Sequence, residues 1–258
     1  MKQLTIRDLT FMRGECPVVD AASMSLNRGE LVGLIGPNGA GKTTLLKLLA
    51  GLLKPARGDM LLDDTPLVDL ADEVRARTLA YLAQERVAHW PISVERIVAL
   101  GRFPHLAPWQ TPSDSDLAII RDAMAETDIL QHRERPISHL SGGEQMRALL
   151  ARALAVQAPV LLVDEPVAAL DPAHAISVMQ ALQRNAASGN AVVAVLHDLT
   201  LAARFCHRLV LMHRGRVVAS GAPSQVLTST HLRQVYGIDL WQSGDGDTPV
   251  IPWHLSQP

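Results

Sequence analysis

The sequence predicts an α/β fold whose core is a mainly parallel sheet. Apolar runs at residues 31–35, 160–163 and 191–196 have the composition of strands that are buried on both faces. Apolar residues repeat at helical spacing directly after the first run, at 43–53, and between the other two, at 172–187. Strands and helices that alternate in this way are typical of a parallel sheet covered by helices.

We expect one domain over residues 1–240, because no linker, charge block or internal repeat divides it, followed by a tail at 241–258. Residues 4–9 have the pattern of a further strand, and a short strand is expected in the tail at 249–251. The segment at about 85–157 lacks long apolar strands, so we interpret it as a helical insert. Its helix-like stretches lie at 94–100, 116–129 and 144–156.

Composition and net charge do not fit a general nucleic-acid binder. The chain has 258 residues, of which 48% are hydrophobic and 19% charged, with a formal net charge of -2. Such a chain can bury a sizeable core. Near-neutral charge and only 3% aromatic residues do not suit a general nucleic-acid binder, which needs a cationic field and stacking surfaces, so no nucleic acid is expected as a partner.

Cysteine usage and hydropathy predict a reduced protein on the cytosolic side. Cys16 and Cys206 lie far apart without a CxxC spacing, and the start MKQLTIRDLT lacks the apolar centre of a signal peptide. No uncharged apolar run approaches the roughly 20 residues of a membrane-spanning helix. Any role at a membrane therefore has to come through a partner.

The segment GPNGAGKTT matches the pattern G-x-x-x-x-G-K-[ST] and lies between a buried strand and a helix, as the chemistry requires. Glycines let backbone N–H groups turn toward phosphate oxygens, the lysine neutralises the outer phosphates, and the first threonine hydroxyl binds Mg²⁺. An ordinary glycine-rich turn is disfavoured, because both the strand and the helix are present. The predicted nucleotide-binding residues are Gly36, Pro37, Asn38, Gly39, Ala40, Gly41, Lys42, Thr43 and Thr44, with Thr43 also binding the metal.

The segment VLLVDEP at 160–166 supplies the carboxylates that a phosphate site needs. Four apolar residues precede Asp164, which is placed to bind Mg²⁺ at a strand end. The next residue, Glu165, can accept a proton from the water that attacks the terminal phosphate. Two solvated carboxylates at a strand end are the alternative, which becomes weak beside Lys42 in the same chain.

The segment LSGGEQMR at 140–147 comes directly before an amphipathic helix. Ser141 occupies the N-cap position, and the bare amides of Gly142 and Gly143 follow it, so this helix start can bind an anion. A capping box of Ser141 and Glu144 that only begins a helix would also account for the local sequence.

At this point the chain resembles the ATP-binding cassette family, whose members carry LSGGQ-like signatures; Glu144 stands where Gln is usual. Gln84 in YLAQE resembles the family's Q-loop, Asp171 in ALDP its D-loop and His197 in VAVLHD its switch histidine. The resemblance covers residues 1–240. It implies a P-loop NTPase with a RecA-like core, an antiparallel N-terminal β subdomain and an inserted α-helical subdomain.

The same resemblance implies a mechanism. Two copies form a head-to-tail dimer, in which residues 141–143 of one copy close on the ATP that the glycine loop of the other holds. Hydrolysis at Glu165 then opens the dimer. Gln84 contacts Mg²⁺ or the attacking water, His197 holds the terminal phosphate, and Asp171 senses the opposite site.

Two positions depart from the family pattern. An aromatic residue that stacks on adenine usually follows the first strand, whereas alignment of LTFMRG puts Arg13 there. A guanidinium can also stack on a base, and Phe11 on the same strand face could serve instead, so both remain candidates. Val167 replaces the usual threonine after DEP, and we expect little catalytic effect from this change.

The segment ISVERIVALGRFPH at 92–105 resembles one in ATPases that drive uptake of iron–siderophore complexes, haem and cobalamin, as do residues 196–221 and 234–240. A helix of the insert that ends at Gly101 and breaks at Pro104 would also explain the first segment. The resemblance implies transmembrane permease subunits, a periplasmic or lipid-anchored substrate-binding protein and a second copy of this chain. It places the chain peripherally on the cytoplasmic face of the inner membrane.

Two other functions were weighed against the importer. A soluble cassette ATPase on nucleic acid or ribosomes usually has two cassettes or a coiled-coil insertion, and this chain has one cassette and no heptad run. A regulatory switch would not need Glu165 and His197. The cargo stays open, because the insert histidines have no metal-ligand spacing and its tryptophans fit packing or permease contact equally; these are His89, His105, His132, Trp90 and Trp109.

Overall fold

The computed structural model describes residues 3–84, 91–168, 170–241 and 251–255. Its centre is a six-stranded sheet in the order β10-β9-β3-β8-β7-β6, in which only the edge strand β10 runs antiparallel to its neighbour. The parallel α/β core is therefore confirmed. The strands are β3 (Leu31–Ile35), β6 (Leu79–Leu82), β7 (Val160–Asp164), β8 (Ala191–Val195), β9 (Arg208–His213) and β10 (Arg216–Gly221).

A second, antiparallel sheet lies at the N-terminal side in the order β2-β1-β4-β5. Its strands are β1 (Gln3–Arg13), β2 (Cys16–Asn27), β4 (Arg57–Leu62) and β5 (Thr65–Pro66). The first strand is longer than the predicted 4–9, and β2 was not predicted. Bulges between the two strands and left-handed backbone at Asp8 and Ala21 interrupt the alternation of apolar and polar residues that identifies a strand.

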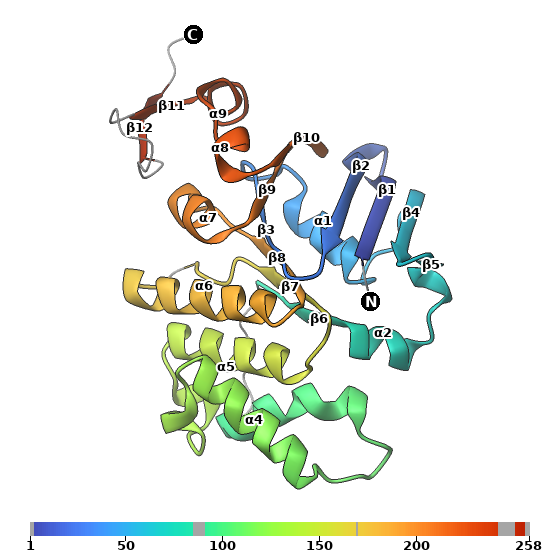
Figure 1. The fold of residues 1–258 in the computed structure, drawn as a ribbon, viewed down its shortest axis with the longest axis vertical. Coiled ribbons are helices and arrows are strands. Elements are labelled where there is room, and N and C mark those ends of the chain that lie inside the picture. Colours follow the sequence, from blue (N-terminus) through green and yellow to red (C-terminus); the bar gives the residue numbers. More distant parts are fainter. Residues whose placement is uncertain (1–2, 85–90, 169, 242–250, 256–258) are drawn as a thin grey trace.

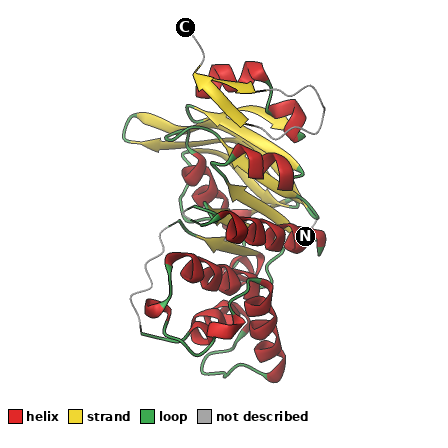
Figure 2. Cartoon of the chain, turned by 90° about the vertical axis from the view of Figure 1, so that its left-hand side faces the viewer, coloured by secondary structure: helices red, strands yellow, loops and turns green. Residues whose placement is uncertain are grey.

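Helices cover both faces of the central sheet, and a helical lobe extends below it in Figure 1. Figure 2 shows the same lobe as a group of helices separate from the two sheets. The lobe is the predicted insert and contains α3 (Val94–Ala99), the 3₁₀ helix η2 (Leu100–His105), α4 (Asp114–Glu126), the 3₁₀ helices η3 (Leu130–His132) and η4 (Ile137–His139), and α5 (Gly142–Ala155). The other helices are α1 (Lys42–Leu49), η1 (Leu67–Asp69), α2 (Asp72–Thr78), α6 (Pro172–Ala187), α7 (Leu199–Phe205), α8 (Pro223–Val226) and α9 (Ser229–Tyr236).

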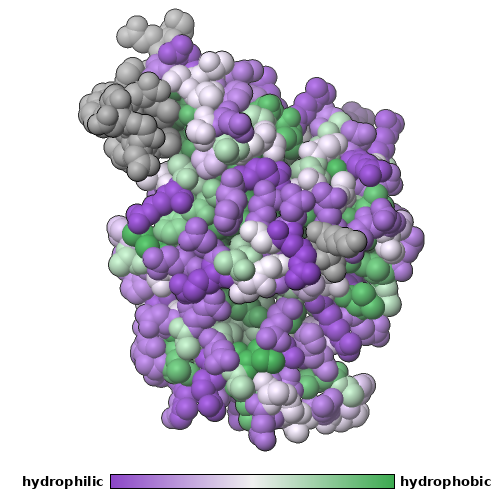
Figure 3. Space-filling view, viewed as in Figure 1, coloured by the Kyte–Doolittle hydropathy of each residue, from purple (hydrophilic) through white to green (hydrophobic). Residues whose placement is uncertain are grey.

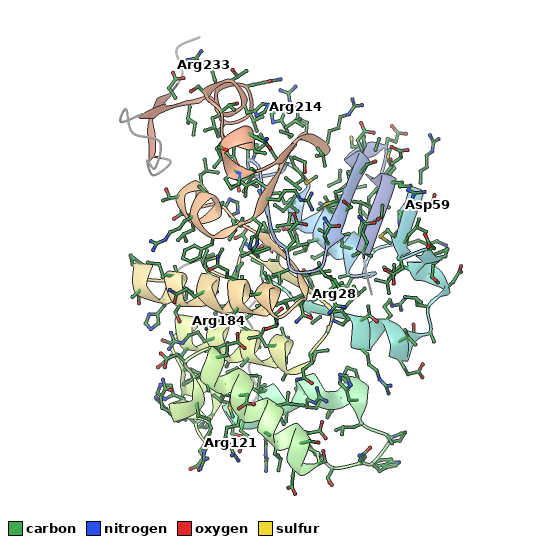
Figure 4. The ribbon with its side chains drawn as sticks, viewed as in Figure 1. Arg28, Asp59, Arg121, Arg184, Arg214 and Arg233 are labelled. Carbon is green, nitrogen blue, oxygen red and sulfur yellow. The ribbon has the colours of Figure 1, made fainter. Side chains whose placement is uncertain are left out.

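Two hydrophobic cores lie on opposite faces of the central sheet. One core packs the lobe, α6 and α7 against it, and the other packs α1 and the antiparallel sheet. All residues of β3, β7 and β8 are buried, as expected for strands covered on both faces. A hydrogen bond also joins the turn between β2 and β3 to the residues just before β8. The Nε atom of Arg28, which is labelled in Figure 4, donates to the Gly189 carbonyl at 2.7 Å.

The alternative explanation of the 92–105 segment, a helix that ends at Gly101, does not describe the structure. The chain continues from α3 directly into η2 without a left-handed residue at Gly101, and Pro104 lies inside η2. At the predicted boundary after residue 240, β11 (Ile238–Trp241) extends one residue further and pairs with β12 (Ile251–Leu255). The predicted strand at 249–251 falls mostly outside the described residues.

Candidate active site

The loop between β3 and α1 is shaped by close contacts that only glycine permits. Gly36 and Gly41 have φ of 149° and 98°. A Cβ at Gly36 would lie 2.3 Å from the Met212 carbonyl oxygen, and one at Gly41 would lie 2.5 Å from that of Val18. The loop thus packs directly against β2 and the end of β9, and a side chain at Gly36 or Gly41 would collide with their backbone.

Lys42 begins α1 and folds back over this loop. Its Nζ donates to the carbonyl oxygens of Gly36 at 2.7 Å and Pro37 at 3.0 Å. The residue is only 6% exposed. Burial lowers the pKa of Lys42, and the carboxylates of Glu165 and Asp164 act in the opposite direction. An ammonium group held between carbonyls can transfer its hydrogen bonds to phosphate oxygens.

Asp164 ends β7 and lies fully buried beside Thr43, whose hydroxyl donates to its Oδ1 at 3.2 Å. Its Oδ2 meets no hydrogen-bond partner in the described part of the chain. Desolvation is the main cause that raises the pKa of Asp164. A buried carboxylate oxygen without a partner, next to a hydroxyl, fits the oxygen ligand set of Mg²⁺.

Glu165 joins two segments that are far away in the sequence. Its Oε2 accepts from Gln84 Nε2 at 2.7 Å, and its Oε1 lies 2.6 Å from His197 Nε2. Gln84 follows β6 and His197 follows β8, on either side of β7, so the three strand ends bring the groups together. Glu165 also has φ of 51°, which is uncommon for a residue with a side chain. A carboxylate held this way can orient a water and accept its proton.

A cavity of about 350 Å³ connects these groups to the glycine loop. Arg13 at the end of β1 lines it, whereas Phe11 packs partly buried against the second core. The structure therefore places Arg13, and not Phe11, in the lining of the cavity. The residues that line the cavity are Arg13, Val18, Asn38, Gly39, Ala40, Gly41, Lys42, Thr43, Thr44, Glu165 and His197.

The signature residues lie at the start of α5 in the helical lobe. Ser141 Oγ accepts from the Glu144 amide at 3.3 Å, and Glu144 Oε2 accepts from the Ser141 amide at 2.7 Å, which is the expected capping box. His132 Nε2 contacts the other carboxylate oxygen of Glu144 at 3.1 Å. Ser141 and Gly142 are exposed, and a Cβ at Gly142 would meet nothing within 4 Å.

The signature and the cavity are not brought together within one chain. Among the described residues that line the cavity, none comes from 141–143. Asp171 does not line it either; it caps α6 by accepting from the His174 amide at 3.0 Å and contacts the His174 ring. These hydrogen bonds lower the pKa of Asp171.

Sequence reasoning missed two residues that shape the loop. Val18 on β2 supplies the carbonyl that faces Gly41. Tyr236 on α9 lies against Gly36, whose backbone hydrogen-bonds to it, although burial still raises the pKa of Tyr236 to about 12. Tyr236 belongs to the resemblance segment 234–240, which gave a signal but no role.

The histidines and tryptophans of the insert, whose roles the sequence left open, differ in their contacts. His105 Nε2 lies 2.8 Å from the Val156 carbonyl, and His132 contacts Glu144, so both take part in structural hydrogen bonds. Trp109 is fully exposed. His89 and Trp90 lie outside the described residues.

The site and fold together define a P-loop nucleoside-triphosphate hydrolase. A glycine loop opens the helix after a buried parallel strand, and a pair of acidic residues ends β7, in contact distance of α1. The chain belongs to the ABC transporter family, because the model of that family matches residues 19–168.

Two relatives are similar to nearly the whole chain. The hemin import ATP-binding protein HmuV of Pseudomonas aeruginosa is 41% identical over 92% of this chain and 93% of its own length. The cobalamin import ATP-binding protein BtuD of Halobacterium salinarum is 42% identical over 91% of this chain, which spans 58% of that longer protein. Among solved structures, a dimeric ATP-binding cassette bound to ADP and phosphate superposes with a TM-score of 0.75 at 25% identity, covering 85% of this chain and 98% of that one.

Proposed function

We propose that the chain is the ATP-hydrolysing subunit of an importer that takes up hemin, an iron–siderophore complex or cobalamin through separate permease subunits. Lys42 and Glu165 line one cavity, and Asp164 is hydrogen-bonded to Thr43 in its wall; this arrangement carries the ATPase part of the proposal. The importer part is supported by the similarity to hemin and cobalamin import ATP-binding proteins over more than nine-tenths of the chain.

In the proposed mechanism, ATP phosphates take the hydrogen bonds that Lys42 now donates to the loop carbonyls. Mg²⁺, held by the Thr43 hydroxyl and Asp164, would supply charge that stabilises the phosphates. Glu165 accepts the proton of the attacking water, and His197 donates to the terminal phosphate. The contact between His197 Nε2 and Glu165 has to open before Nε2 can donate to the phosphate, whereas the Glu165 oxygens, each with two lone pairs, can accept from the water while Gln84 stays bound.

A second copy of the chain completes the site in this proposal. The amides of Gly142 and Gly143 are presented at an exposed helix start, away from the chain's own cavity. A head-to-tail dimer lets them contact ATP held by the partner copy, with Asp171 near the opposite site. The likeness to a dimeric cassette with bound ADP and phosphate supports this arrangement.

The permease docks on the helical lobe in this proposal, on the cytoplasmic face of the membrane, and a substrate-binding protein delivers the cargo to it. The full exposure of Trp109 favours permease contact over packing for that side chain. Within the described ranges, no helix has both the length and the apolar character needed to cross a bilayer. The near-neutral chain gives no support to the nucleic-acid alternative.

The test is ATPase activity in liposomes that contain the permease encoded beside this chain, with its binding protein and with hemin, a ferric siderophore or cobalamin. We expect one ligand to stimulate hydrolysis and to enter the liposomes. The Glu165→Gln complex is the matched control for both signals. If neither the permease nor any ligand changes the rate of hydrolysis, the importer part of the proposal is contradicted, whereas the ATPase part stands.

A further inference from the structure

The Glu144 carboxylate lies at the start of α5 and forms contacts in two directions. Its Oε2 accepts from the Ser141 amide at 2.7 Å, and its Oε1 lies 3.1 Å from His132 Nε2. The first contact holds a negative charge beside the amide that directly precedes Gly142. Like charges repel, so this carboxylate disfavours a phosphate at the same helix start.

The backbone beside Gly142 is nevertheless open to an anion. A Cβ at Gly142 would meet nothing within 4 Å, whereas one at Gly143 would lie 3.1 Å from Leu170 Cδ2. The start of α5 thus offers free space next to its first amides while it carries the Glu144 charge. A phosphate binds there more favourably when that charge is offset.

The contact between Arg135 and His132 assigns the tautomer of the histidine. Arg135 Nη1 lies 3.3 Å from His132 Nδ1, and a guanidinium has donors but no acceptor. His132 Nδ1 therefore accepts, which leaves the ring proton on Nε2 to be donated to Glu144 Oε1. The three side chains Arg135, His132 and Glu144 form a directional series of hydrogen bonds, called the relay below.

Arg135 supplies a positive charge at the far end of the relay. Hydrogen bonds from Ser141 are the main cause that lowers the pKa of Glu144, and the charge of Arg135 acts in the same direction. Hydrophilic side chains cover much of the lobe in Figure 3, and the side chains of His132 and Glu144 are 21% and 24% exposed. Dissolved salt can therefore screen the electrostatic part of these contacts.

The loop that carries the relay is fastened to the start of α3. The carbonyls of Arg135 and Arg133 accept from the amides of Val94 and Glu95, at 3.0 and 2.9 Å. These amides belong to the first turn of α3, where N–H groups have no partner within the helix. The relay therefore starts from a supported backbone.

We propose that His132 and Arg135 are positioning residues for the ATP that the partner copy holds. Their relay keeps the Glu144 carboxylate in its capping position and offsets its charge, so that the phosphates can approach the amide of Gly142. Neither residue is among the described residues that line the chain's own cavity, so both act through Glu144. This inference rests on the proposed function, because that function supplies the second copy.

The experiment measures ATP-dependent dimer formation by the full chain in a Glu165→Gln background, which should bind ATP without hydrolysing it. Sedimentation gives the dimer dissociation constant, and a fluorescent ATP analogue gives the affinity of dilute single chains. His132→Leu removes the relay's donor, Arg135→Met removes its cation, and His132→Gln retains a donor and an acceptor. Arg133→Leu is the matched control, because Arg133 lies on the same loop and contacts Glu134 at 3.1 Å instead of Glu144.

We expect His132→Leu to raise the dimer dissociation constant about tenfold, since each of the two sites in a dimer loses about threefold. Arg135→Met should raise it by a smaller factor. His132→Gln and Arg133→Leu should stay within about twofold of the Glu165→Gln parent. The ATP affinity of the single chain should change less than about twofold in every variant, because the relay lies outside the chain's own cavity.

Neutralising Glu144 separates the offset of its charge from a structural role of His132. In a Glu144→Gln background there is no charge to offset, so His132→Leu should change the dimer dissociation constant by less than about twofold. Raising the salt concentration from about 0.05 to 0.5 M should also reduce the effect of His132→Leu.

Two results would overturn the relay. One is an unchanged dimer dissociation constant in His132→Leu, and the other is an equal loss in the Glu144 and Glu144→Gln backgrounds, which indicates a structural role alone. If the Glu165→Gln parent itself forms no dimer with ATP, the dimeric site of the proposed function is contradicted together with the relay. A normal parent dimer with unaffected variants contradicts the relay alone.

Discussion

The starts of α1 and α5 are both helix N-termini that can bind an anion, but they are built in opposite ways. The N-cap of α1 is Gly41, in a left-handed conformation and without a side-chain cap among the described residues, and the buried Lys42 follows. The N-cap of α5 is Ser141, which forms a capping box with Glu144. One terminus leaves its amides to a ligand and adds a positive charge. The other satisfies two of its amides, those of Ser141 and Glu144, with its own side chains, and it carries a negative charge.

This difference predicts which terminus contributes more to the ATP affinity of a single chain. An uncapped terminus with a lysine gains most from a bound phosphate, so α1 should determine the ATP affinity of a single chain. Glu144 opposes an anion at α5, so this terminus should contribute only when a second copy presents it to ATP that is already bound. Substitutions at the two termini test this division, and replacement of Glu165 should have the largest effect.

Replacing the proposed base tests the cavity half of the comparison. We expect Glu165→Gln to retain ATP binding and to lower the hydrolysis rate by about 10²–10⁴, the usual contribution of a general base. Steady-state ATPase assays and ATP titration measure the two quantities. The glutamine cannot accept the proton but keeps a similar shape, so unchanged turnover would exclude Glu165 as the base.

Mixing two inactive variants tests whether one site uses two chains. Lys42→Ala removes the α1 half, and Gly142→Asp places a charge in the open space beside the α5 half. Each alone should be inactive, whereas their mixture forms dimers with one intact site and should recover a substantial fraction of wild-type ATPase. A mixture of Lys42→Ala with Glu165→Gln is the control, since both changes lie in the same half and no site is restored. Equal activity of the two mixtures would contradict the shared site.

Nucleotide affinity of the single chain compares the two termini directly. Lys42→Ala should weaken ATP binding by about 10- to 100-fold, because a charged hydrogen bond is lost. Gly142→Asp should change it by less than about twofold, because that terminus lies outside the chain's own cavity. Dilute chain, titrated with a fluorescent ATP analogue, gives both values. A large loss of ATP affinity in Gly142→Asp under these conditions would contradict the proposal that the start of α1 determines the affinity of a single chain.

The role of Arg13 can be separated from that of Phe11. Arg13→Ala should lower ATP affinity by about fivefold if the guanidinium stacks on adenine, and Arg13→Tyr should restore it. Phe11→Leu should leave affinity unchanged. Comparing ATP with tripolyphosphate, which has no base, is the deciding measurement, since loss of both ligands alike would indicate a phosphate contact instead.

The smallest effect concerns the cap of α5. Hydrogen bonds from Ser141 lower the pKa of Glu144, so its contribution to stability is present above the ordinary glutamate pKa and is lost as pH falls through the lowered value. Wild-type Tm should therefore decrease by about 1–3 °C more than that of Glu144→Gln between pH 6 and 3. Parallel curves for the two proteins would show that the charge does not stabilise this cap.

Local patterns predicted the parts of the site that are continuous in sequence. Lys42 and Asp164 follow apolar strands, and Ser141 with Glu144 has the spacing of a capping box, so each was found from its neighbours. Glu165, in contrast, contacts Gln84, which is 81 positions away in the sequence, and His197, which is 32 positions away. They depend on the order of the strands in the sheet, which periodicity does not contain.

For some residues, packing in the structure gives a role that differs from the one their local sequence suggests. Gly101 has the sequence character of a helix end, yet it is needed because the α5 backbone passes too close for a side chain. Arg13 and Phe11 lie on one strand and could not be separated until the core was seen to take up Phe11. In both cases the deciding neighbour comes from a distant part of the chain.

The left-handed backbone at Glu165 also bears on how this position can change during evolution. A side chain in that conformation costs on the order of 1 kcal/mol, which Gly or Asn would largely avoid. The backbone conformation therefore favours these two amino acids at residue 165, and a requirement for turnover, together with the contacts to Gln84 and His197, opposes the change. A homologous cassette with Gly or Asn at this position would be expected to bind nucleotide as a stable but inactive paralogue.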